Sequence, residues 1–152
     1  MPQPLTTEEL RQRALAFLRQ RADAIPNAMP DPSAALSLTA CDGPSGSITF
    51  AYETLPWMSN IWGVVHGGVT ACLVDTCMGI TCGVQCGMVT PTISMTVNYP
   101  RPVPLEALVH VRTRTVRIGS SAGQIAAEVF RPEEPGKILA SASGVYHVRQ
   151  TK

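Results

Sequence analysis

A long apolar segment that follows a pair of glycines limits what this chain can fold into. Between Gly67 and Val84 the only charged residue is Asp75. A helix that is apolar on every side must be buried. We therefore expect a helix of about residues 67–86 at the centre of the fold, closed by the glycine at 87. A carboxylate in that setting is costly unless its charge is matched or used.

Composition and charge exclude several classes of protein. A chain of 152 residues with 45% hydrophobic and 15% charged residues suits one compact domain and argues against extended disorder. The net charge is +1 and no Lys/Arg cluster occurs, so we expect no nucleic-acid partner. Asp75 interrupts the best apolar run, and we expect no membrane partner. The first residues lack the pattern of a secretory signal.

The cysteines point to a reducing compartment. There are five, an odd number, and four of them lie in the predicted central helix, at positions 72, 77, 82 and 86. We interpret them as reduced thiols in the core of a cytoplasmic protein. No Cys-x-x-Cys spacing occurs, so we expect neither a metal nor a redox site.

The remaining elements follow from capping and periodicity. Thr6 and Glu9 match a capping box for an amphipathic helix of about residues 7–24, and prolines then indicate a linker. Alternation with period two predicts strands near residues 35–40, 48–52, 92–99, 105–118, 124–130 and 137–148. This order predicts an α+β fold in which an antiparallel sheet curls around one long helix. We expect residues 1–33 to form an N-terminal helix and linker and residues 34–150 to form the domain.

The start of the predicted central helix offers donors to a ligand. The first N–H groups of a helix have no partner within the helix and carry a partial positive charge. Gly67 and Gly68 lack side chains, so an oxyanion formed in acyl transfer can approach these donors closely. Asn60 could add an amide donor, and His66 could orient the loop or contact the same oxygen. In the alternative, His66 only caps the helix and the glycines only permit tight packing.

Asp75 suggests that two chains share one site. It follows Gly67 by eight residues, which is about 12 Å along a helix axis. Two central helices packed antiparallel about a two-fold axis could bring the carboxylate of one to the start of the other. Such a carboxylate suits a general base for water or a nucleophile, and Thr92 could hold the water. In the alternative, Asp75 caps a shorter helix from Thr76 and Thr92 is an ordinary strand residue.

These residues resemble a known family. Asn60, the triplet His66-Gly67-Gly68 and Asp75, with the small-residue helix and the segment Thr92–Pro102, resemble the hotdog-fold acyl-CoA thioesterases. The resemblance covers about residues 34–149 and is greatest to the phenylacetate-degradation-type branch, which is related to 4-hydroxybenzoyl-CoA thioesterase. It implies a hotdog fold, hydrolysis of an acyl-CoA to free acid and CoA, and no cofactor. It also implies a homodimer, often doubled to a homotetramer, with sites shared between chains.

The resemblance also assigns roles to residues. Asp75 is implied as nucleophile or general base, with Thr92 near the attacking water. The Gly67 N–H and the Asn60 amide are implied to polarise the thioester carbonyl, supported by His66. The implied substrate-binding residues are Gly68, Arg101, Ser120 and Ser121. Some members of the family carry Glu at the acidic position, so the choice between the two mechanisms stays open.

Three other functions compete with this interpretation. Residues 119–123 match the Gly-x-Ser-x-Gly nucleophile elbow around Ser121, and Glu133, Glu134 and His147 follow in the right order. We expect the next segment to be the return strand of a hairpin, which makes that match accidental. A hotdog domain could also bind acyl-CoA without cleaving it, although a desolvated Asp75 favours catalysis. A hydratase would need paired Asp and His on one loop, which this sequence lacks.

The acyl group cannot be read from the sequence. Four large side chains either line an apolar or aryl pocket or belong to the core: Trp57, Met58, Trp62 and Met78.

Overall fold

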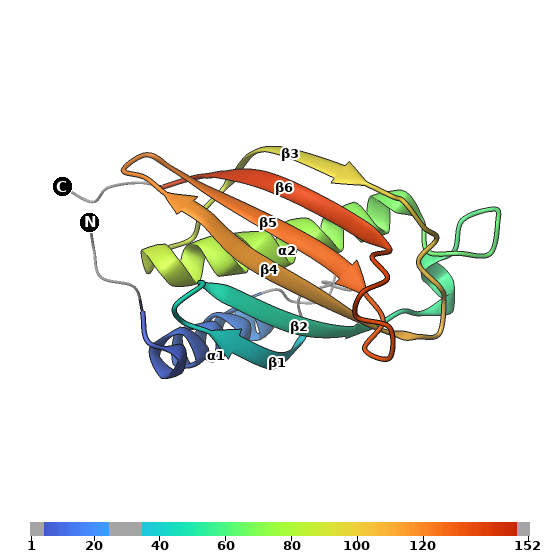
Figure 1. Cartoon of the computed structure of the whole chain (residues 1–152), viewed down its shortest axis with the longest axis horizontal. Coiled ribbons are helices and arrows are strands. Elements are labelled where there is room, and N and C mark those ends of the chain that lie inside the picture. Colours follow the sequence, from blue (N-terminus) through green and yellow to red (C-terminus); the bar gives the residue numbers. More distant parts are fainter. Residues whose placement is uncertain (1–4, 25–34, 149–152) are drawn as a thin grey trace.

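The computed structural model describes residues 5–24 and 35–148, and it consists of one curved sheet with a long helix against it (Figure 1). Six antiparallel strands form the sheet in the order β1-β2-β4-β5-β6-β3. The strands are β1 (Ser37–Asp42), β2 (Ser47–Glu53), β3 (Thr92–Asn98), β4 (Leu108–Ile118), β5 (Ala122–Phe130) and β6 (Ala140–His147). The predicted α+β class and the order of elements are confirmed, while the predicted linker lies outside the described residues.

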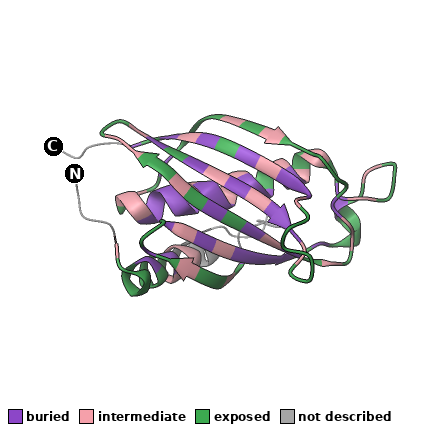
Figure 2. Cartoon of the chain, in the orientation of Figure 1, coloured by how far each residue is buried: buried purple, intermediate pink, exposed green. Residues whose placement is uncertain are grey.

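The central helix α2 (Gly67–Cys86) is continuous, as its apolar sequence predicts. It ends at Gly87, whose φ of 71° is the left-handed conformation that favours glycine. Val74 and Met78 are fully buried among the inward-facing side chains of the sheet, such as Val111. Each buried side chain of this size contributes about 1.5–3 kcal/mol to folding. This packing, with alternating buried and exposed strand residues (Figure 2), fixes the position of the helix.

One side of α2 is not covered by the chain itself. Gly68 and Cys72 are exposed and Asp75 is half-buried. Their spacing of four and three residues places them on the same side of the helix. The helix is long and apolar enough by composition to cross a membrane, but it is mostly packed inside the chain. The expectation of a helix buried all round is therefore wrong for a single chain.

Helix α1 (Thr7–Ala24) covers the far end of α2. Its start has the predicted capping box, in which the Glu9 N–H donates to Thr6 Oγ1 at 3.2 Å and the Thr6 N–H to Glu9 Oε2 at 2.9 Å. Leu10 is fully buried in the core shared with the sheet, and the Arg13 guanidinium donates to the Val84 carbonyl at 3.3 Å. Helix α1 thus lies at the opposite end of α2 from Gly67 (Figure 1).

Two features of the sheet matter for function. Within residues 5–24 and 35–148, strand β3 pairs only with β6, so its other edge is open there, and Ile93 on it is 59% exposed. The turn between β4 and β5 is a hairpin turn in which the Gly119 N–H donates to the Ala122 carbonyl at 2.8 Å. Strand β5, and not a helix, begins directly after Ser121, so the nucleophile-elbow interpretation is excluded.

Candidate active site

Asp75 lies where α2 meets two strands. The Thr92 hydroxyl, at the start of β3, donates to Asp75 Oδ1 at 2.9 Å. The Tyr146 hydroxyl, on β6, donates to the same oxygen at 3.0 Å. Because α2 runs unbroken through Asp75, the alternative in which this residue caps a shorter helix is wrong. In the other alternative, Thr92 is an ordinary strand residue. The hydroxyl of Thr92 instead contacts the carboxylate directly.

Tyr146 is the residue that sequence reasoning missed. Its side chain is fully buried, and burial together with the negative charge of Asp75 raises the pKa of its phenol. The ring fits because residue 144 is a glycine: a Cβ there would lie 2.7 Å from the ring. The run of small residues 140–144 in β6, followed by a tyrosine on the inward-facing side of the strand, is the signal that could have identified it.

The start of α2 presents a single open donor. The Gly68 N–H donates to His66 Nδ1 at 2.9 Å, and the N–H groups of Val69 and Thr70 donate to the His66 carbonyl. No acceptor among the described residues takes the Gly67 N–H. The expectation that Gly68 offers an open donor is therefore wrong, because His66 caps the helix through that group. With Nδ1 as acceptor, a neutral His66 carries its proton on Nε2.

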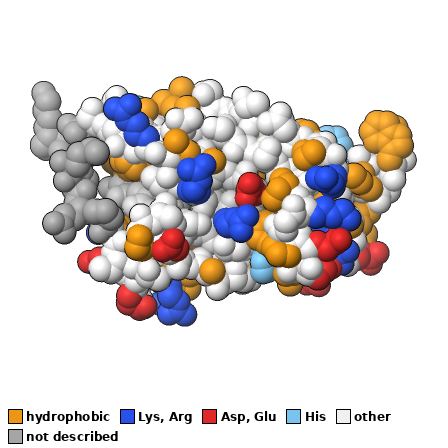
Figure 3. Space-filling view, viewed as in Figure 1, with side chains coloured by type: hydrophobic (Ala, Val, Ile, Leu, Met, Phe, Trp, Pro, Cys, Tyr) orange, Lys and Arg blue, Asp and Glu red, His pale blue; other side chains and the backbone are white. Residues whose placement is uncertain are grey.

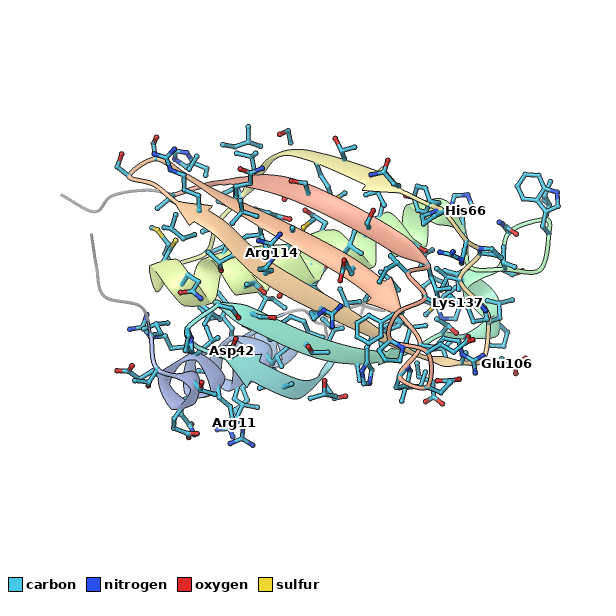
Figure 4. The ribbon with its side chains drawn as sticks, viewed as in Figure 1. Arg11, Asp42, His66, Glu106, Arg114 and Lys137 are labelled. Carbon is cyan, nitrogen blue, oxygen red and sulfur yellow. The ribbon has the colours of Figure 1, made fainter. Side chains whose placement is uncertain are left out.

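Asn60 is held so that only one end of its amide is free for a ligand. Its Oδ1 accepts from the Trp62 N–H at 2.9 Å and from the Val64 N–H at 3.4 Å. The side-chain NH₂ is left as a donor. Asn60, His66 and Gly67 line one open hollow of about 570 Å³ together with residues 59, 61 and 62. Figure 4 shows His66 at the end of α2 that adjoins this loop.

The carboxylate does not line this hollow. Asp75 is separated from Gly67 by eight residues of continuous helix, or about 12 Å at 1.5 Å per residue. The sequence-predicted residues therefore form two groups within one chain. Asn60, His66 and Gly67 lie at the start of α2, while Asp75 and Thr92 lie further along it.

The residues expected to bind CoA lie at two separate places. The Arg101 guanidinium donates to the Ile138 carbonyl at 2.8 Å, so Arg101 holds the loop before β6. Ser120 and Ser121 line a hollow of about 310 Å³ with Arg117 at the β4–β5 turn. This turn lies at the opposite end of the molecule from the Asn60 loop (Figure 1).

The large apolar side chains divide into two sets. Met58 and Met78 belong to the core, with 1% and 0% exposure. Trp57 and Trp62 are 52% and 77% exposed. Figure 3 shows hydrophobic side chains projecting from the loop at this end of the molecule. Only the exposed pair remains available to an acyl group.

Among the described residues, no three His, Cys, Asp or Glu side chains gather into a metal site. All five cysteines are thiols. Cys77 and Cys82 are fully buried, where they fill space as small apolar side chains.

Comparison with known proteins shows which family and which solved structures this chain resembles. The model of the Thioesterase superfamily matches residues 63–137, which include Gly67, Asp75 and Thr92. A phenylacetic acid degradation-related protein from Ralstonia eutropha is 21% identical, with a TM-score of 0.72 over 90% of this chain and 99% of that chain. The Escherichia coli PaaI protein of the phenylacetic acid degradation operon is 18% identical, with a TM-score of 0.75 over 95% and 96%.

A third similar structure contains a ligand. A Streptococcus mutans protein bound to acetyl-CoA is 17% identical, with a TM-score of 0.68 over 83% of this chain and 94% of that chain. At these identities the structural neighbours show the shared fold, which is the hotdog fold. The chain is thus similar to the Thioesterase superfamily over residues 63–137 and shares its fold with these neighbours.

Proposed function

We propose that this protein hydrolyses acyl-CoA thioesters to a carboxylic acid and CoA, with Asp75 activating the attacking water. Similarity to the Thioesterase superfamily over residues 63–137 supports the reaction class. The observation that carries the mechanism is the Asp75 carboxylate, which two hydroxyl groups hold by one oxygen on the uncovered side of α2. A carboxylate fixed beside an open surface suits a general base.

The carbonyl would be polarised at the start of α2. The Gly67 N–H has no acceptor among the described residues and carries the partial positive charge of the helix end. The Asn60 NH₂ opens on the same hollow. As water attacks the carbonyl carbon, these donors would stabilise the oxyanion. The C–S bond then breaks and CoA leaves as the thiolate.

We further propose that each site takes its two halves from two chains. The separation of about 12 Å between Gly67 and Asp75 is too great for one carbonyl. The open edge of β3, with its exposed Ile93, could pair with the same edge of a second copy. A two-fold axis there would set two α2 helices antiparallel, so that the Asp75 of one faces the Gly67 of the other.

The same two-fold symmetry supports a proposed binding position for the CoA portion of the substrate. In one chain the β4–β5 turn and the start of α2 lie at opposite ends of the molecule (Figure 1), and Gly67 at that start lines the hollow. An antiparallel partner would bring its turn toward the hollow of the first chain. Arg117 lies in the same small hollow as these serines and could bind a phosphate. The acetyl-CoA in the Streptococcus mutans neighbour supports this class of substrate.

For the acyl portion, we propose contact with the exposed side chains beside the oxyanion donors. Ile61 is 90% exposed and Trp62 is 77% exposed, and both line the hollow that Asn60 and Gly67 share. A flat aromatic wall of this kind suits an aryl-containing acyl group. The phenylacetic acid degradation-related neighbours are compatible with that choice.

A thiol-release assay tests the proposed function. Purified protein is incubated with acetyl-, hexanoyl-, benzoyl- and phenylacetyl-CoA, and free CoA is followed with a thiol reagent. We expect release with at least one of these and a fall of about 10²–10⁴-fold in Asp75→Asn, the range that general-base groups contribute. Tight binding of acyl-CoA without release by the native protein would favour a non-catalytic acyl-CoA sensor instead.

A further inference from the structure

We infer that Tyr146 is a positioning residue that makes Oδ2 of Asp75 the oxygen that takes the proton from water. This inference rests on the proposed function, because it concerns the same carboxylate. It adds a residue from the last strand to the site and assigns different tasks to the two oxygens of one side chain.

Both hydroxyl donors contact the same oxygen. Thr92 Oγ1 lies 2.9 Å and Tyr146 Oη 3.0 Å from Asp75 Oδ1. A carboxylate oxygen has about two lone-pair sites, so these two donors occupy Oδ1. No described residue donates to Oδ2, and no described Lys, Arg or His forms an ion pair with Asp75. A water molecule can therefore be held only at Oδ2.

Tyr146 is the rigid member of this pair of donors. Thr92 is exposed at the edge of the sheet, whereas the side chain of Tyr146, on β6, is fully buried. The phenol oxygen also lies 3.3 Å from the Asp75 carbonyl oxygen, which ties it to the helix backbone. The ring packs where a Cβ on Gly144 would lie 2.7 Å from it. The buried phenol thus sets the orientation of the carboxylate.

This division of tasks has a chemical consequence. When Oδ2 takes a proton from water, the water oxygen forms a bond to the carbonyl carbon, and both hydrogen bonds at Oδ1 can persist. No side chain has to turn during the step. Groups that keep their positions during the reaction lower its barrier. A carboxylate without these two anchors could rotate and present either oxygen.

The test removes one hydroxyl oxygen and keeps the ring. In Tyr146→Phe we expect kcat to fall about tenfold to 10²-fold, with KM within twofold of the native value. The matched control is Tyr52→Phe, which removes another buried phenol oxygen, one that lies 3.9 Å from Met58 Sδ. In an Asp75→Asn background the Tyr146→Phe change should cause no further loss. A native kcat in Tyr146→Phe, or equal losses in the two phenylalanine variants, would overturn the inference.

A second measurement separates this inference from the proposed function. If the native protein released no CoA from any substrate in the panel, the proposed function would be contradicted. The assignment of Asp75 Oδ2 as the oxygen that takes the proton would be contradicted as well. The contact between Tyr146 and Asp75 would still be tested by a double-mutant cycle. It compares the unfolding free energies of Tyr146→Phe, Asp75→Asn and the double variant in denaturant. A non-additive result supports Tyr146 as the anchor of Asp75. An additive result would overturn it even in an active enzyme.

Discussion

At the scale of single residues, the site depends on a glycine that no catalytic argument would select. A Cβ on Gly144 would lie 2.7 Å from the Tyr146 ring, 2.9 Å from its hydroxyl oxygen and 3.1 Å from the end of Met78. We predict that Gly144→Ala displaces the phenol from Asp75. The expected cost is about 1–3 kcal/mol of unfolding free energy for overpacking. We also expect a fall of up to about 10²-fold in kcat from misplacement of the carboxylate.

The measurement for this prediction is denaturant unfolding combined with steady-state kinetics. Gly136→Ala is the matched control, because a Cβ there meets nothing within 4 Å. The control should keep both native stability and native kcat. Full activity in Gly144→Ala would contradict the prediction. It would show that the Tyr146 ring can shift without moving the Asp75 carboxylate.

A second prediction at this scale concerns two thiols near the end of α2. A hydrogen bond from Cys82 lowers the pKa of Cys86, while the same bond and burial raise the pKa of Cys82. In Cys82→Ala the donor is lost, so the pKa of Cys86 should rise. At pH 7 a higher pKa leaves a smaller thiolate fraction, and alkylation of Cys86 by iodoacetamide should slow. Peptide mass mapping measures the rate. An unchanged or faster rate would contradict the assignment, and Cys77→Ala controls for the lost buried volume.

At the scale of elements, α1 stabilises the fold without entering the site. Leu10 is fully buried, and α1 packs at the end of α2 away from Gly67 (Figure 1). We predict that Leu10→Ala lowers the unfolding free energy by about 2–5 kcal/mol. In the protein that remains folded, kcat and KM should keep their native values. Denaturant titration and kinetics well below the unfolding midpoint test both parts. A changed KM would mean that α1 reaches the substrate.

The loop before α2 should determine acyl preference. Asn60 Oδ1 accepts hydrogen bonds from the Trp62 and Val64 N–H groups, so the residue that we propose polarises the carbonyl also fixes the loop that carries Trp62. We predict that Trp62→Ala lowers kcat/KM for phenylacetyl-CoA by about tenfold or more, with little change for acetyl-CoA. Trp57→Ala is the control, since Trp57 is exposed but does not line the hollow. Equal losses for both substrates would place Trp62 outside the acyl site.

Most elements could be predicted from the sequence, because local patterns specify them. The capping box at Thr6 and the glycine pair at 67–68 mark where α1 and α2 begin, and both helices have the predicted bounds. The contact between Tyr146 and Asp75 could not be predicted, since 71 residues separate the partners. The bond from the Gly68 N–H to His66 depends on a side-chain rotamer, which periodicity does not specify.

At the scale of the whole molecule, the proposed catalytic groups of one chain form two separate sets. Gly67 and Asn60 offer donors without a carboxylate, and Asp75 with Thr92 offers a carboxylate without donors for an oxyanion. The open edge of β3 lies beside the uncovered side of α2. Symmetric pairing through this edge would complete both sites at once, because each chain lends one half and receives the other.

Mixing two inactive variants tests whether the halves come from different chains. Asp75→Asn removes the carboxylate and Asn60→Ala removes a donor at the other half-site. When equal amounts are refolded together, about half of the dimers are mixed, and each mixed dimer has one intact site of two. Activity should therefore recover to about a quarter of the native value. Asp75→Asn mixed with Thr92→Val should show no more activity than the two variants measured separately, because both changes lie in the same half-site. No recovery in the first mixture would mean that each chain acts alone, and recovery in the second would mean that Asp75 and Thr92 belong to different half-sites.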